Sequence, residues 1–134
     1  MILHLTQHPA TPDQLAAGVV DLGGDDRAAL VRLLTFEALP TRAEIIARAD
    51  ALAALAAAFA ASEDREDGTT GFALSAMIGG APYLMAPLET ALRDAGIEPV
   101  YAFSVRESEE KTQPDGTIRK VAVFRHAGFV GRES

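Results

Sequence analysis

The sequence predicts an α/β fold in which a mostly parallel sheet is flanked by helices and ends in a C-terminal antiparallel β-hairpin. Short apolar runs alternate with helix-like stretches along most of the chain, an order typical of parallel strands joined by crossover helices. The order changes after residue 98, where two strand-like stretches (99–113 and 117–130) are joined by the turn sequence PDGT. With 134 residues, we expect one domain over residues 1–134, with the hairpin at 99–130.

The N-terminal part predicts two strands with a short helix between them. MILHLTQ (1–7) has the apolar character and length of a buried strand, and VVDL (19–22) predicts a second one. Between them, Thr11 is a suitable N-cap, Pro12 suits the first helical position and Gly18 can end the helix.

Two further helices are expected in the next forty residues. The first follows GGDD, with Asp25 or Asp26 as its N-cap. The second begins at Thr41, because Thr41 and Glu44 have the spacing of a capping box. Its apolar residues recur at helical spacing and are alanine-rich, which favours a slim helix packed closely on a sheet: Ile45, Ala49, Leu52, Ala56 and Phe59.

The middle of the chain predicts a loop, a strand and a helix. SEDREDGTTG (62–71) is polar and indicates a loop, and FALSAMIGG (72–80) indicates a strand. We expect Pro87 in the first turn of the following helix, because a proline inside a helix breaks it, and Gly96 just past its end. The order of these elements is that of a small Rossmann-like domain.

Composition argues against several kinds of protein and site. The chain has no cysteine, which excludes disulfides and thiolate sites, and we find neither a metal-ligand spacing nor a nucleophile elbow, so no metal and no cofactor is expected. The net charge of −7 argues against a protein that coats long nucleic acid. The longest apolar run (51–61) is short of the roughly 18–20 residues of a membrane span, and the N-terminus lacks a signal-peptide pattern, so a cytoplasmic protein is expected.

Positive charge is concentrated in the last quarter of the chain. Residues 1–100 contain six Lys and Arg against fourteen Asp and Glu, whereas residues 101–134 contain six against five. Two interpretations stay open: a small anion held near the C-terminal segment, or a solvated, charged hairpin.

Polar or glycine-rich residues follow three of the predicted strands. Because the carboxyl ends of parallel strands meet at one edge, where open sheets bind ligands, we expect these residues to gather there. They are Thr6, Gln7 and His8; Gly79, Gly80 and Ala81; and Ser104 and Arg106. The glycine pair suits backbone approach to an anion, or it is only a tight turn.

Several of these candidates have a structural interpretation as well as a functional one. Arg106 suits a phosphate, or it pairs with one of the carboxylates of the ESEE run that follows it. His8 suits acid/base work or caps a loop, and Ser104 donates to a ligand or simply ends a strand. His4 is expected to be a satisfied interior residue. His126 is expected to be an exposed strand residue, with a site or a partner subunit as the other interpretation.

Three short pieces carry a family resemblance: HPATPDQ after the first strand, PVYAFSVR, and FRHAGF at the end of the hairpin. With these pieces the chain resembles small CRISPR-associated proteins of the CARF-like ring-nuclease type. The resemblance implies a Rossmann-like (CARF-like) domain that forms a homodimer and binds cyclic oligoadenylate, the second messenger of type III CRISPR defence. Long nucleic acid and a membrane are not expected as partners, because of the net charge of −7 and the short apolar run described above.

The resemblance also implies a reaction and roles for residues. The ring is linearised without metal by attack of a ribose 2′-hydroxyl on the adjacent phosphate, chemistry that needs positioning and charge stabilisation. Arg106, Ser104 and His8 would be catalytic, and Thr6, Gln7, Gly79, Gly80 and Ala81 would bind ligand and phosphate. The acidic run beside Arg106 departs from this pattern, because it should repel a polyanion. The alternatives are a non-catalytic module that senses or sequesters a cyclic nucleotide, and a protein-interaction domain that uses its hairpin.

Overall fold

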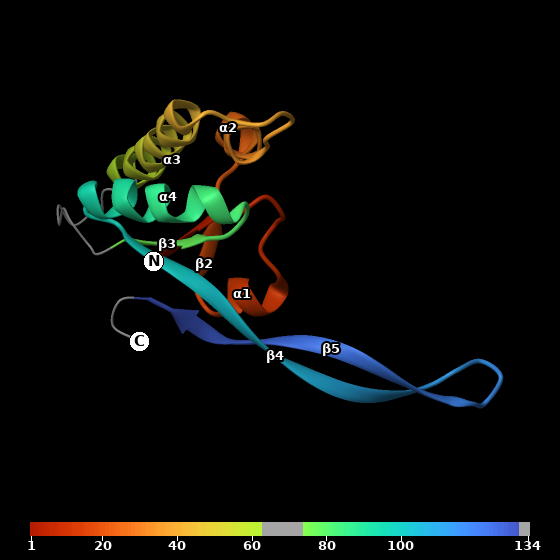
Figure 1. The fold of residues 1–134 in the computed structure, drawn as a ribbon. Helices are drawn as coiled ribbons and strands as arrows, with labels where there is room; N and C mark the ends of the chain where they lie inside the picture. Colours follow the sequence, from red (N-terminus) through yellow and green to blue (C-terminus); the bar gives the residue numbers. More distant parts are fainter. Residues whose placement is uncertain (63–73, 132–134) are drawn as a thin grey trace, which may run out of the picture.

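The computed structural model describes residues 1–62 and 74–131, and it contains one five-stranded sheet with the strand order β2-β1-β3-β4-β5 (Figure 1). The first four strands in this order are parallel neighbours, and the last two are antiparallel. This confirms the expected α/β architecture. The strands are β1 (Ile2–Leu5), β2 (Val19–Asp21), β3 (Ser75–Ile78), β4 (Glu98–Thr112) and β5 (Ile118–Val130).

Helices cover the two faces of the sheet unequally. α2 (Gly24–Leu34), α3 (Arg42–Ser62) and α4 (Pro82–Asp94) lie on one face, and the short α1 (Pro12–Ala16) lies on the other (Figure 1). Strand β1 shows why the faces differ. Leu3 and Leu5 point into the large core beneath the three helices, whereas the side chain between them, His4, points to the opposite face. There a smaller apolar cluster forms around Val19, Met77 and Val100.

Helix α3 is alanine-rich and slim as expected, but it packs chiefly against other helices and not against the sheet. Its buried residues are Ala49, Leu52, Ala53 and Ala56, and its main neighbours are α4 and α2. Thr41 accepts a hydrogen bond from the backbone N–H of Glu44 at 3.1 Å, so the predicted start is confirmed. Among the described residues, α3 is long and apolar enough by composition alone to cross a membrane, although charged side chains lie along its first three turns.

Two predicted helix starts were wrong. Helix α2 begins at Gly24, with Gly23 as its N-cap, so Asp25 and Asp26 lie in its first turn instead of capping it. Helix α4 begins at Pro82, which places Pro87 inside it. The apolar stripe that reaches the core explains the longer helix, because it starts before Pro87: Leu84, Leu88 and Leu92 are all fully buried.

The predicted end of α4 is confirmed, whereas most of the predicted loop lies outside the described residues. Gly96 follows the C-cap of α4 with φ +77°, as expected of a glycine just past a helix end. Of the loop predicted at 62–71, Ser62 is the last residue of α3 and the remainder lies outside the described residues.

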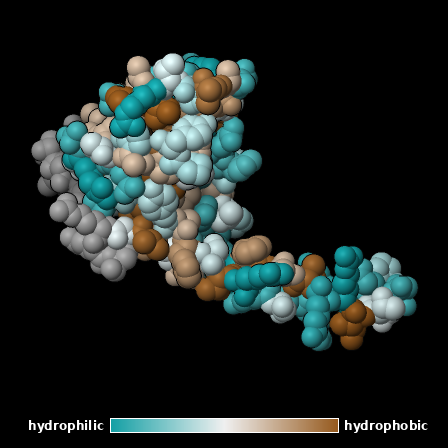
Figure 2. Space-filling view, viewed as in Figure 1, coloured by the Kyte–Doolittle hydropathy of each residue, from teal (hydrophilic) through white to brown (hydrophobic). Residues whose placement is uncertain are grey.

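The C-terminal hairpin extends well beyond the rest of the sheet. Strand β3 pairs with β4 only at Glu98, Pro99 and Val100, after which β4 and β5 continue as a two-stranded arm (Figure 1). Its tip is the predicted PDGT turn, in which the N–H of Gln113 donates to the carbonyl of Thr117 at 2.7 Å. Figure 2 shows hydrophobic and hydrophilic residues interspersed along this arm. We call residues 103–126 the arm below.

Candidate functional site

The parallel sheet reverses its strand order between β1 and β3. The chain passes from β1 to β2 on one side, and it later returns to place β3 on the other side of β1. Ligands of open α/β sheets bind beyond the carboxyl ends of the strands at such a switch point. Thr6 directly follows β1 and Gly79 directly follows β3, and a Cβ atom on Gly79 would lie 3.5 Å from Thr6 Cγ2. The structure therefore brings two of the three predicted segments together.

The two glycines after β3 differ in what they require. Gly80 has φ +138°, a conformation that side-chain-bearing residues rarely adopt, whereas Gly79 has no such requirement. The backbone N–H of Gly79 points toward β1, because Leu5 and Ile78 are the last pair of the β1–β3 ladder. Within the described part of the chain, no hydrogen bond uses the backbone N–H of Gly80 or Ala81, and α4 begins directly afterwards. These two donors are therefore free to face a ligand at the switch point.

A buried polar network lies directly beneath Thr6. The side chain of His4 is 1% exposed, its Nε2 lies 2.6 Å from Thr6 Oγ1, and its Nδ1 lies 3.0 Å from Asp21 Oδ1. The pKa of His4 is lowered from its usual value, chiefly because burial disfavours the charged ring. Asp21 opposes this shift and Arg27 adds to it. The prediction that His4 is a satisfied interior residue is confirmed.

Arg27 holds the segment that follows β1. Its NH1 donates to the carbonyl of Thr6 at 3.3 Å and its NH2 donates to the carbonyl of Gln7 at 2.8 Å. The side-chain amide of Gln7 donates to Thr35 Oγ1 at 3.0 Å, so it points toward the end of α2. His8 is exposed, and its carbonyl lies 3.3 Å from Thr6 Oγ1. Arg27 therefore fixes the backbone at Thr6 and Gln7.

Ser104 and Arg106 lie on the arm and away from the Thr6–Gly79 contact. Ser104 is four residues past Val100, the last residue of β4 that pairs with β3, which is about 13 Å along an extended strand. Both side chains are exposed. The third predicted segment therefore borders the switch point instead of entering it.

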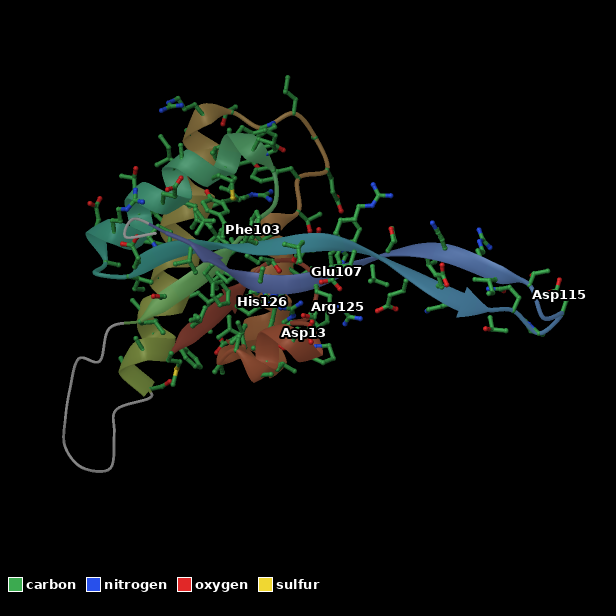
Figure 3. The ribbon with its side chains drawn as sticks, turned by 90° about the horizontal axis from the view of Figure 1, so that it is seen from below. Asp13, Phe103, Glu107, Asp115, Arg125 and His126 are labelled. Carbon is green, nitrogen blue, oxygen red and sulfur yellow. The ribbon has the colours of Figure 1, made fainter. Side chains whose placement is uncertain are left out.

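Two of the three glutamates that follow Arg106 face away from it. Arg106 stands opposite Phe124 on one face of the arm, which Glu110 shares four residues further on, whereas Glu107 and Glu109 lie on the other face and pair with Arg125. Figure 3 shows Glu107 beside Arg125. The Arg125 Nε–Glu107 Oε2 distance is 2.9 Å. Among the described residues, no ion pair involves Arg106, so the repulsion and the competing ion pair considered from sequence do not arise with Glu107 or Glu109.

His126 is half-buried, so its expected exposure was wrong. It stands opposite Ser104 in the register of β4 and β5, and its ring centroid lies 4.7 Å from that of Phe129. Its Nδ1 atom is buried and has no hydrogen-bond partner among the described residues. Packing against Phe129 explains the burial.

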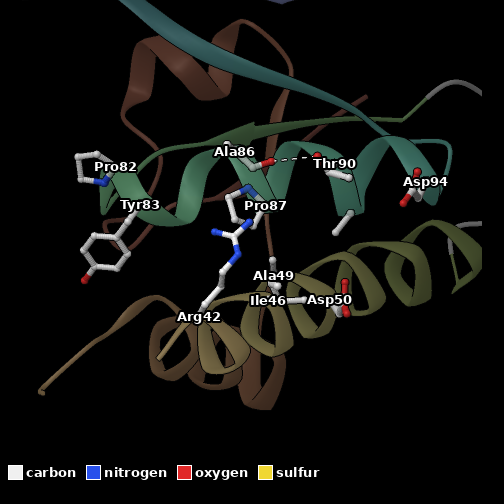
Figure 4. A pocket seen from close by; sticks show the side chains of 11 residues that line it. Arg42, Ile46, Ala49, Asp50, Pro82, Tyr83, Ala86, Pro87, Thr90 and Asp94 are labelled. Carbon is white, nitrogen blue, oxygen red and sulfur yellow. Dashed lines mark hydrogen bonds between the residues drawn. The ribbon is translucent and has the colours of Figure 1, made fainter. Parts of the chain in front are cut away.

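A groove of about 560 Å³ lies between α3 and α4 (Figure 4). Its lining residues include Arg42, Ile46 and Ala49 of α3 and Ala86 of α4. None of its lining residues is one of the predicted site residues. The groove is therefore a separate feature of the helical face.

Sequence reasoning missed the participation of Asp21 and Arg27. The strand pattern offered a partial signal, because His4 and Thr6 are two residues apart and so share one face of β1. Asp21 pairs with His4 in the register of β1 and β2, which no local pattern specifies. Arg27 comes from the first turn of α2.

Comparison with known proteins identifies a family without an assigned function. Neither the curated proteins nor the solved structures contain a match to this chain. A family model described as "Uncharacterized protein MJ1673 family" matches residues 1–130, nearly the whole chain. The chain therefore belongs to the uncharacterized protein MJ1673 family.

Proposed function

We propose that this protein binds a cyclic oligoadenylate at the β1/β3 switch point and linearises it without a metal ion. The observation that carries the proposal is the contact between Thr6 and Gly79, which joins two strand ends beside the backbone N–H groups of Gly80 and Ala81, which no described residue uses. A phosphate diester needs such donors, and the following helix start favours negative charge. The CARF-like ring-nuclease resemblance supplies the ligand class.

An exposed arginine on the arm, Arg106, favours an anionic ligand. Arg106 is exposed, has no ion pair among the described residues and lies on the face of the arm opposite Glu107 and Glu109. A guanidinium in this state is available for phosphate oxygens. Ser104 lies on the same face of β4 and suits a ribose or phosphate oxygen, while the exposed His8 supplies a group for proton transfer.

A second candidate is a non-catalytic module that senses or sequesters the same ligand. The position of Ser104 and Arg106, four and six residues past the last β4 residue that pairs with β3, favours it, because catalysis requires the reacting groups within a few ångströms. In both candidates we place the protein in the cytoplasm as a homodimer of Rossmann-like, CARF-like domains acting in type III CRISPR defence.

One experiment tests the proposal and separates the two candidates. The pure protein is incubated with cyclic tri-, tetra- and hexa-adenylate, with and without EDTA, while products are identified by mass spectrometry and Tm is measured in parallel. Linear products with 2′,3′-cyclic phosphate ends in EDTA support the nuclease. An intact ring that raises Tm supports the binding module. A panel that neither reacts nor raises Tm contradicts both, and leaves an interaction function for the arm.

A further inference from the structure

We propose that Asp21, His4 and Thr6 form a proton relay whose outer hydroxyl, Thr6 Oγ1, removes a proton from a substrate hydroxyl at the switch point. The three groups form one chain of contacts: Asp21 Oδ1 to His4 Nδ1 at 3.0 Å, and His4 Nε2 to Thr6 Oγ1 at 2.6 Å. An acid, an imidazole and a hydroxyl in this order are the parts of an activated hydroxyl. The inference rests on the proposed function for the identity of the substrate.

The relay requires one tautomer of the His4 ring, with the hydrogen on Nδ1 and with Nε2 as the acceptor. On Nδ1 this hydrogen faces the Asp21 carboxylate oxygen at 3.0 Å. Two contacts oppose this tautomer: Arg27 NH1, which can only donate, lies 3.2 Å from the same nitrogen, and the carbonyl of His8 is a second acceptor for the Thr6 hydroxyl at 3.3 Å. The charged carboxylate is the strongest acceptor at the ring, so the proposed relay has the hydrogen on Nδ1 and the Thr6 hydroxyl donating to Nε2.

Burial prepares His4 for the role of a base. The ring is 1% exposed, and the charged groups that face it are Asp21 of β2 and Arg27 of α2. Desolvation lowers the pKa of His4, so the ring is neutral near pH 7 and able to accept a proton. When it does so, the Asp21 carboxylate at 3.0 Å stabilises the imidazolium. Thr6 itself is only partly buried, which leaves the end of the relay accessible.

The relay fits attack by a ribose hydroxyl. The 2′-O–H bond breaks, its proton passes to Thr6 Oγ1, and the proton of Thr6 passes to His4 Nε2. The 2′-oxygen forms a bond to the adjacent phosphorus while the bond from phosphorus to the 5′-oxygen breaks. The 5′-oxygen takes a proton from water, and His4 returns its extra proton to water. The products are a 2′,3′-cyclic phosphate and a 5′-hydroxyl, so atoms and charge balance without oxidant or metal.

Conservative substitutions test the relay by kinetics. Thr6→Val replaces the hydroxyl by a methyl group and retains the β-branched shape, so it should lower kcat by roughly 10²–10⁴-fold, a far larger effect than any change in Kd, while Thr6→Ser should retain most of kcat. Asp21→Asn removes the charge that supports the His4 imidazolium, so the acidic limb of the kcat–pH profile should move to lower pH. If Thr6→Val cleaves the ring as fast as the wild type does, the relay is wrong, whereas the proposed nuclease function still stands.

Nuclear magnetic resonance of the imidazole nitrogens gives a readout that does not depend on activity. In ¹⁵N-labelled protein, the His4 ring should show a proton on Nδ1 and none on Nε2 at pH 7.5, assigned by comparison with a His4→Gln variant. Asp21→Asn should lower the His4 pKa further. A His4 ring protonated on Nε2 overturns the relay, because it would donate to Thr6 and could not take its proton. A wild-type protein that binds the ring without cleaving it overturns the relay and the nuclease, and leaves the binding module.

Discussion

Gly79 and Thr6 meet across the switch point of the sheet, so that a Cβ atom added to Gly79 would lie 3.5 Å from Thr6 Cγ2. The contact joins the ends of β3 and β1, which are 73 residues apart in the sequence but neighbours in the sheet. It leaves the space beside Gly79 open to a ligand, because glycine has no side chain to fill it. This relationship decides how the two adjacent glycines should respond to substitution.

Gly79→Ala should leave the fold intact and weaken ligand binding. Its Cβ would make an ordinary van der Waals contact at 3.5 Å, and its φ lies outside the region reserved for glycine, so we expect a change in the free energy of unfolding within about 0.5 kcal/mol. An extra methyl group against the ligand should raise the Kd for cyclic oligoadenylate roughly tenfold or more. Calorimetric titration and urea unfolding of the same variant measure both quantities.

Gly80→Ala is the matched control for the effect of an added methyl group on stability. The φ of +138° makes any side chain costly there, so this variant should lose about 1–3 kcal/mol of stability. If Gly79→Ala binds the ligand as tightly as the wild type, the backbone at position 79 does not face it.

Arg106→Ala should weaken ligand binding, whereas Arg119→Ala should not. Both residues are exposed on the arm and each variant removes one positive charge, so any effect of net charge is the same in both. Arg119 stands opposite Lys111, further toward the tip of the arm than Arg106. Loss of a charged hydrogen bond at Arg106 should raise Kd by about tenfold or more. Equal affinities of the two variants would place the ligand away from this face.

Stability should fall as the pH is lowered below the usual range of histidine. Burial lowers the pKa of His4 in the folded protein, so the unfolded chain binds this proton more readily than the folded chain does. The stabilising effect of the neutral ring is fully present above the unfolded pKa of about 6.5 and is lost as pH falls from there through the folded pKa. Urea unfolding at pH 8.0 and 5.5 should show a larger decrease for the wild type than for His4→Gln. Equal decreases would mean that His4 does not carry this pH dependence.

Arg48→Ala should destabilise the protein more than Arg93→Ala. Both arginines form an ion pair with a glutamate four residues earlier on the same helix, at 2.9 and 3.1 Å respectively. Only Arg48 also donates to carbonyls at the end of α2, including that of Thr35, and lies over the Phe36 ring at 4.2 Å from its centroid. We expect a loss of about 2 kcal/mol for Arg48→Ala and under about 1 kcal/mol for Arg93→Ala, measured by chemical unfolding.

Local signals predicted most of the elements but not every boundary. The turn sequence PDGT and the capping residue Thr41 identified the hairpin and the start of α3, because their effects act within a few residues. Pro87 misled the prediction, because the burial of Leu84 and Leu88 stabilises a helix that continues through the proline. The hairpin was predicted as two strands of the sheet, but most of it extends beyond the sheet because β3 has only four residues with which to pair.

The sequence by itself determined the α/β architecture, the hairpin and the strand ends at Thr6 and Gly79, because apolar period, turn residues and strand–helix order are written locally along the chain. Only the tertiary structure decided that His4 meets Asp21 and that Arg27 reaches the carbonyls after β1. It likewise decided that Arg125 of β5 pairs with Glu107 and Glu109 of β4. Such contacts depend on strand order and register, which result from packing the whole sheet against its helices. No short stretch of sequence therefore predicts them.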